Sequence, residues 1–182
     1  MNFPNIDLID GENPTISSPT CAYVLQFDQT RESLLDIETY KSFLDNAILR
    51  FRHSETYIKY KSFLMELGLD RCQFHGNITS EMADIEMHHN MLTIFDIAII
   101  LTEHQLNTVG KITTFDLVEL LKQEHKKNRV QLVMLTKTPH QLFHNNSKFF
   151  IHPRMCFGNW QEFLRLYHDG ITRDIANKLI YY

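Results

Sequence analysis

The chain has 182 residues, of which 43% are hydrophobic and 22% charged, with only six glycines and five prolines. This composition is typical of soluble globular proteins and excludes a disordered chain, a collagen-like repeat and a coiled-coil rod. The net charge of −4 shows no basic excess of the kind that marks many nucleic-acid-binding proteins.

The charge is unevenly distributed along the chain. Residues 1–46 contain eight acidic and two basic side chains, a net charge of −6, whereas the remainder carries +2 before any histidine is protonated. Most of the histidines also lie in the second part, between His75 and His168. The acidic segment therefore predicts a surface for a protein partner, and the downstream segment permits polyanion binding.

Cysteine usage and hydropathy indicate the compartment. Cys21, Cys72 and Cys156 are odd in number and far apart, which favours a reducing compartment over a disulfide framework. No apolar run reaches the roughly 18 to 20 residues that cross a bilayer, and the N-terminus lacks the pattern of a secretory signal. We expect no membrane association and a cytoplasmic location, in a bacterial or phage-infected cell.

Residues 1–70 are predicted to form an acidic N-terminal arm followed by a helical hairpin. Apolar residues recur at three- and four-residue steps from Ser33 to Phe51, which indicates the buried face of one helix. A second such series runs from Tyr57 to Leu67, and Gly68 follows it where a left-handed C-cap would end the helix.

Residues 71–182 are predicted to hold two strands, a helical insertion and closing helices. An extended segment at Asp84–His89 is followed by two Thr-x-x-Asp capping boxes, which begin at Thr93 and Thr113 and each predict a helix start. Val130–Leu135 is an apolar run of strand length.

The C-terminal third is predicted to be helical. Pro139 suits the first turn of a helix, because proline lacks only an amide that would be unpaired there. Closing helices are expected at Gly158–Tyr167 and Thr172–Tyr182. The fold class is therefore predicted to be α+β and mainly helical.

Two histidine clusters carry the candidate chemistry. His88 and His89 end the first predicted strand, two residues after Glu86. His140 and His144 lie four residues apart on a predicted helix, so both imidazoles project from one face. Neighbouring residues of a strand point to opposite faces, so only one of the first pair can join them. Three imidazoles leave positions on a metal ion open for water or a phosphate oxygen, as hydrolytic centres need.

The order Glu-x-His-His, then a strand, then a helix with His-x-x-x-His resembles the HNH or ββα-metal endonucleases, particularly their colicin-nuclease branch. The resemblance implies a divalent metal ion (Mg²⁺, Mn²⁺, Zn²⁺ or Ni²⁺) held by His88, His140 and His144. It also implies that His89 is the general base that activates water. Glu86 would orient a basic side chain near the scissile phosphate.

Two features differ from the family pattern. About forty residues (90–129) separate the two strands, and we expect them to form a helical insertion within the ββα-metal element. The asparagine that gives the motif its middle letter is replaced by Gln131, and the nearest asparagine is Asn128. A group at one of these two positions is expected to brace the loop that holds His89.

Five basic residues near the second strand are expected either to contact phosphates of double-stranded DNA or to form only a solvated face. These residues are Lys122, Lys126, Lys127, Arg129 and Lys137. His104, His125, His152 and His168 are expected at the surface or at helix ends, whereas His75, upstream of the motif, is a candidate to assist it.

Three hypotheses follow from the sequence. The first is a metal-dependent endonuclease that hydrolyses the phosphodiester bonds of DNA through a histidine-activated water. The second is a non-catalytic binding or inhibitory protein on the same frame, which contacts a partner through its acidic segment. The third is a helical module in which the histidines only pack.

Overall fold

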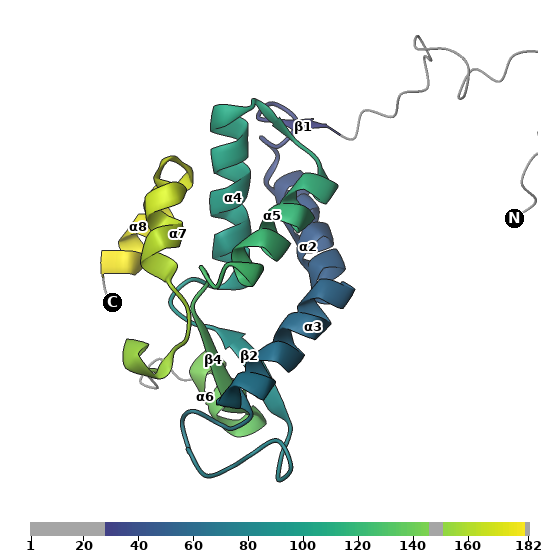
Figure 1. Cartoon of the computed structure of the whole chain (residues 1–182). Helices are drawn as coiled ribbons and strands as arrows, with labels where there is room; N and C mark the ends of the chain where they lie inside the picture. The colour runs from purple at the N-terminus through teal and green to yellow at the C-terminus, as the bar shows by residue number, and fades with distance from the viewer. Residues whose placement is uncertain (1–27, 146–150, 181–182) are drawn as a thin grey trace, which may run out of the picture.

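The computed structural model describes residues 28–145 and 151–180, apart from the side chains of residues 143–145 and 153. Within these ranges the chain is α+β and mainly helical, which confirms the predicted fold class. The greater part of the predicted acidic arm lies outside the described residues. Figure 1 shows most helices gathered at one end of the molecule and a small strand–strand–helix element at the other.

Three helices form the larger end: α2 (Ile37–Arg52), α4 (Ile94–Thr108) and α5 (Thr114–Lys126). They pack against one another in all three pairings. The later part of the apolar stripe predicted for α2 is its buried face, whereas Leu35 and Ile37 at the start of the stripe are exposed. Asp36 is the N-cap of α2, and its carboxylate accepts a hydrogen bond from the Thr39 amide at 2.8 Å.

Both predicted capping boxes are present, and each begins a helix of the insertion. Thr93 Oγ1 accepts from the Asp96 amide at 3.1 Å, while the Asp96 carboxylate accepts from the Thr93 amide at 3.0 Å. Thr113 and Asp116 repeat this reciprocal arrangement at the start of α5. These local pairs satisfy backbone amides that the helix itself leaves unpaired, so they fix where α4 and α5 begin.

Two further elements connect to this helical end. Strand β1 (Gln29–Thr30) pairs antiparallel with β3 (Lys111–Ile112), which lies between α4 and α5. Helix α3 (Glu55–Leu64) leads from α2 towards the strand–strand–helix element and continues into the wide turn η2 (Met65–Leu69). The predicted left-handed glycine is confirmed within that turn, where Gly68 has a φ of 91°.

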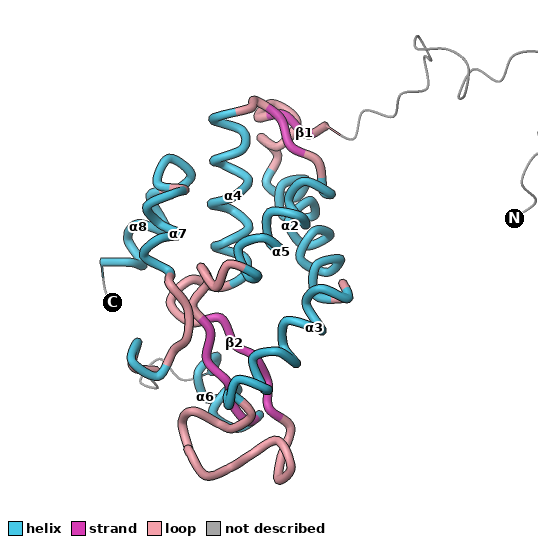
Figure 2. Tube along the Cα trace, in the orientation of Figure 1, coloured by secondary structure: helices cyan, strands magenta, loops and turns pink. Residues whose placement is uncertain are grey.

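The other end consists of β2 (Ile85–His89), β4 (Leu132–Thr136) and α6 (Lys137–Asn145), which we call the ββα element. The strands are antiparallel, with Ile85 opposite Thr136 and His89 opposite Leu132. Figure 2 shows these two strands, in magenta, at the end of the molecule away from β1. Helix α6 follows β4 directly and packs on both strands. It begins two residues before Pro139, which still lies in the first turn where its missing amide costs no hydrogen bond. The helical insertion separates β2 from β4, as predicted.

The closing helices are α7 (Trp160–Leu166) and α8 (Arg173–Ile180), with single turns η3 (Pro153–Met155) and η4 (His168–Gly170). Lys178 of α8 donates to Asp96 Oδ1 at 2.6 Å, which ties the C-terminal segment to the start of α4.

The buried apolar residues form two clusters. The larger draws on α2, α4, α5, α7 and α8, so it includes residues from both predicted segments; the division at residue 70 stays a prediction. The smaller cluster lies under the ββα element and contains Cys72, Ile85, Val133, Met134, Leu135 and Ile151.

Candidate active site

Strand β2 positions the first histidine cluster. Side chains alternate along a strand, so Glu86 and His88 share one face while His89 points to the other. Both histidines are almost fully buried, with 5% and 7% of their surface exposed. The adjacent rings therefore have different surroundings, as the sequence predicts for a His-His pair.

On one face of β2, Glu86 and His88 meet His140 of α6. The His88 and His140 rings are edge to face, with centroids 4.8 Å apart. The Glu86 carboxylate accepts a hydrogen bond from His140 Nδ1. A neutral His140 ring with its proton on Nδ1 carries its lone pair on Nε2. The described partner of the Glu86 carboxylate is thus an imidazole, and an orienting role near a phosphate stays a prediction.

The predicted metal ligands are brought together in part. His88 and His140 are neighbours, although 52 positions separate them in the sequence. His144 lies one turn after His140 on α6, and its side chain is outside the described part of the chain. Among the described side chains, no group of three or more His, Cys, Asp or Glu is arranged to hold a metal ion. Two imidazoles and an adjacent carboxylate are what these residues provide.

On the opposite face of β2, His89 meets His125 of α5. His89 Nε2 and His125 Nε2 are 2.9 Å apart, and His125 Nδ1 donates to the Leu121 carbonyl at 2.7 Å. His125 was predicted to lie at the surface or at a helix end. It does belong to the last turn of α5, but an exposed position is wrong, because only 1% of the residue is exposed. It packs against the rings of Phe51, Tyr57 and Tyr60, with centroids 4.5 to 6.2 Å away.

Burial sets the charge of this pair. Desolvation lowers the pKa of His125 to about 4. Desolvation, followed by the charges of His125 and Arg52, lowers the pKa of His89 well below its usual value. Both rings are therefore neutral at pH 7, which is the form that a general base requires.

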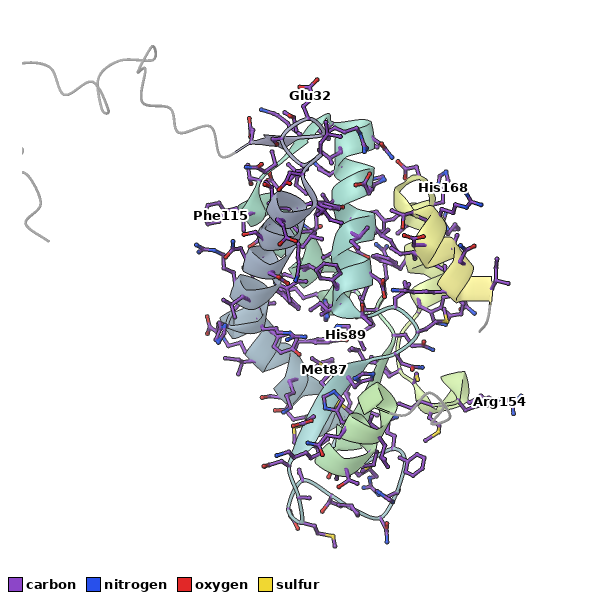
Figure 3. All side chains as sticks on the ribbon, turned by 180° about the vertical axis from the view of Figure 1, so that it is seen from behind. Glu32, Met87, His89, Phe115, Arg154 and His168 are labelled. Atoms are coloured by element: carbon purple, nitrogen blue, oxygen red, sulfur yellow. The ribbon has the colours of Figure 1, made fainter. Side chains whose placement is uncertain are left out.

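A pocket of about 470 Å³ opens over this region. Figure 3 shows Met87 and His89 along β2, where the strand passes beneath the helices. The ββα element provides one wall, and Arg52 of α2 with Tyr57 and Lys61 of α3 provides another. The residues that line it are Arg52, Tyr57, Lys61, Glu86, Met87, His88, His89, Thr93, Ile94 and His140.

Arg52 and Lys61 were not predicted from the sequence as site residues. They give the pocket two positive charges, and neither forms an ion pair within the part of the chain that the structure describes. Nearby Lys59 differs, because it pairs with Glu55 at 2.6 Å on the outside of α3. The periodicity of α2 and α3 does not mark these two residues as site residues, because the other wall of the pocket comes from a distant part of the sequence.

The five predicted phosphate contacts lie elsewhere. None of them lines the histidine pocket. Lys122 pairs with Glu119, Arg129 lies near Glu124 and Glu162, and Lys127 is the C-cap of α5. Lys126 lines a separate surface hollow beside α3, and Lys137 is exposed at the start of α6. Their contact with DNA stays a prediction.

The two candidates for the missing asparagine behave differently. The Gln131 carbonyl accepts from the Asn90 amide at 3.1 Å, so its backbone braces the residue that follows His89. Asn128 instead has a φ of 53°, and its side chain accepts from the Tyr60 hydroxyl at 3.0 Å. Asn128 therefore connects α3 to the end of the insertion, and a role for Gln131 in bracing the loop that holds His89 stays a prediction.

The model of a family described as bacteriophage G278-like virion protein matches residues 4–181. No curated protein and no solved structure matches the chain. Across the described residues, the structure contains no helix long and apolar enough to cross a membrane.

Proposed function

The chain belongs to the family of bacteriophage G278-like virion proteins, and on that premise we propose that it is a metal-dependent phosphodiesterase of the phage particle that cuts DNA. The observation that carries this proposal is the meeting of His88, His140 and Glu86 with the cations Arg52 and Lys61 around one pocket. Imidazoles that can bind a metal ion, beside cations that form no ion pair with a described residue, suit a site for a phosphodiester.

His88 and His140 fit a divalent cation as two of its ligands. A ligand atom lies about 2 Å from such an ion, so the proposal requires one nitrogen of each ring to face the cation. The Glu86 hydrogen bond to His140 Nδ1 is the carboxylate–histidine arrangement that commonly orients a metal-binding imidazole. His88 and His140 would hold the cation, and His144 is the expected third ligand. When bound, the cation supplies positive charge where negative charge develops on the phosphate.

His89 is the proposed general base. Its ring is neutral at pH 7 and lines the pocket. The ring accepts a proton from water while the water oxygen forms a bond to phosphorus. The bond from phosphorus to the leaving ester oxygen then breaks; that oxygen keeps the electron pair and takes a proton from solvent.

Arg52 and Lys61 are the proposed phosphate-positioning residues. Their side chains come from the wall opposite the ββα element, so a phosphate in the pocket would lie between them and the histidines. Guanidinium and ammonium groups bind phosphate oxygens through charge-assisted hydrogen bonds.

The test is plasmid nicking by the full chain in Mg²⁺, Mn²⁺, Zn²⁺ or Ni²⁺, together with calorimetric titration of each ion. His140→Ala is expected to reduce both ion affinity and nicking at least about 100-fold, because it removes a ligand. The matched control is His168→Ala, whose ring is exposed and remote from the pocket. Stoichiometric DNA or protein binding without cleavage in any ion would support the non-catalytic hypothesis instead, and an unaffected His140→Ala variant would remove the proposed metal site.

A further inference from the structure

The buried contact between β2 and α5 assigns a role to a residue outside the histidine motif. We propose that His125 is a positioning residue that holds the His89 ring with its Nε2–H towards the core and its Nδ1 lone pair towards the pocket. This inference rests on the proposed function, because it concerns the base of that reaction.

The hydrogen bonds of His125 determine which nitrogen carries each proton. His125 Nδ1 lies 2.7 Å from the Leu121 carbonyl oxygen, which can only accept, so Nδ1 carries the proton of this ring. With the ring neutral in its buried site, His125 Nε2 has a lone pair. The contact of 2.9 Å between the two Nε2 atoms therefore needs its proton from His89. His89 is thus the Nε2–H tautomer.

This tautomer leaves the lone pair of His89 on Nδ1. No described residue provides a hydrogen-bond partner for that atom, and it is not among the fully buried polar atoms that lack one. It is therefore reached from the pocket that His89 lines. The opposite tautomer would place two lone pairs against each other in the core and a proton where the base must accept one.

The His125 contact also keeps a hydrogen-bond partner for the His89 ring after the proton transfer. As Nδ1 takes a proton from water, the hydroxide oxygen bonds to phosphorus and the ring becomes an imidazolium. Its Nε2–H remains aimed at the His125 lone pair, and a hydrogen bond from a charged donor is shorter and stronger than one from a neutral donor. A third group that orients the base is a general device of activated nucleophiles.

Two structural features make His125 rigid enough for this role. Its ring is enclosed by Phe51, Tyr57 and Tyr60, which come from α2 and α3. Its Nδ1 bond to Leu121 is made within α5, whose start is fixed by the Thr113 capping box. The helical insertion thereby contributes directly to the site on the ββα element.

The test is nuclear magnetic resonance of the full chain labelled with ¹⁵N-histidine, in which two-bond couplings distinguish the tautomers of each ring. The wild type is expected to show His89 as Nε2–H and His125 as Nδ1–H. His125→Gln keeps a side-chain acceptor and should retain the His89 tautomer, whereas His125→Phe has no acceptor and should lose it. A wild-type His89 with its proton on Nδ1 overturns the proposal, even if no variant folds.

Nicking kinetics supply the second measurement. His125→Phe is expected to lower kcat roughly 10- to 100-fold at unchanged KM, with His125→Gln within a few-fold of wild type. Equal loss in both variants, or an unchanged His89 tautomer in His125→Phe, contradicts the positioning role. The predicted tautomers in a protein that never nicks DNA support the placement of the His89 lone pair and overturn the hydrolase proposal alone.

Discussion

The ββα element and the helical insertion that interrupts it are stabilised in different ways. The insertion begins both of its helices with capping boxes and buries α4 and α5 in the larger core. The ββα element has only a small buried cluster, and the polar side chains of β2 and α6 face a pocket. The proposed chemistry thus lies in the region with the smaller core, and most of the buried apolar residues lie in the region with few candidate site residues.

Among the described side chains, the two regions are joined by the polar contact of His89 with His125. The difference predicts that changes on the ββα element alter activity before stability, that changes in the insertion do the reverse, and that changes at the shared pair do both.

The largest expected effect is at His89. His89→Ala removes the proposed base, so nicking should fall roughly 100- to 10,000-fold, which is the usual contribution of general base catalysis. Ion affinity should stay near that of wild type, because His88 and His140 remain. Nicking rates and calorimetric ion titrations on the same preparations measure the two effects. Wild-type nicking by this variant would place the base elsewhere.

The shared pair predicts a loss of stability in acid. The folded protein holds the pKa of His125 at about 4, whereas the unfolded chain has the ordinary value near 6.5. Between these values the unfolded state binds more protons, so the free energy of unfolding decreases as pH falls from about 6.5 to 4 and is unaffected by this group above that window. The loss from His125 alone is on the order of 3 kcal/mol.

Urea unfolding at pH 7 and at pH 4.5 measures this loss. Acidic groups also titrate in this range, so the informative quantity is the difference between wild type and His125→Gln, which lacks the buried imidazole. The exposed His168→Gln serves as the control and should keep the wild-type pH dependence. A His125→Gln variant with the same acid sensitivity as wild type would show that the pair is not what destabilises the fold.

The pocket wall opposite the ββα element gives a smaller effect. Arg52→Gln and Lys61→Gln should each weaken DNA binding about 10-fold and reduce the slope of log affinity against log salt by about one, as expected for a lost phosphate contact. Lys59→Gln is the matched control on the outer face of α3. Equal effects at Lys59 and Lys61 would mean that the general charge of α3, and not the pocket, attracts DNA.

The sequence predicted the insertion better than the site. The capping boxes are local and satisfy backbone groups within four residues, so Thr93 and Thr113 marked both helix starts correctly. The histidine spacing and the family resemblance predicted that His88 would approach His140, and the structure confirms that contact. Edges were less exact, because strand β4 begins at Leu132 and not at Val130.

The unpredicted residues are those whose role depends on contacts between distant segments. His125 lies in the basic last turn of α5, and a basic last turn is equally typical of an exposed helix end. Only the packing of α2 and α3 over it makes it a buried partner of His89. Arg52 and Lys61 likewise become pocket residues because α3 passes above β2, which no periodicity of their own helices indicates.

The smallest expected effect lies in the insertion, at Thr113. Thr113→Ala removes the side-chain acceptor for the Asp116 amide at the start of α5, so stability should fall by about 1 kcal/mol. For a chain of this size that corresponds to a decrease in Tm of roughly 2 to 4 °C. The neighbouring Thr114→Ala is the control, because no hydrogen bond of the Thr114 side chain contributes to the cap.

Nicking by Thr113→Ala at temperatures where it remains folded should equal that of wild type, because Thr113 does not line the pocket. Unchanged nicking tests the difference between the two regions more directly than the change in stability does. Since α5 carries His125 at its other end, a variant that frays only the first turn tests whether the pair depends on the whole helix. If a fully folded Thr113→Ala variant nicked DNA more slowly than wild type, the first turn of α5 would influence the site through the helix. The insertion would then affect activity as well as stability.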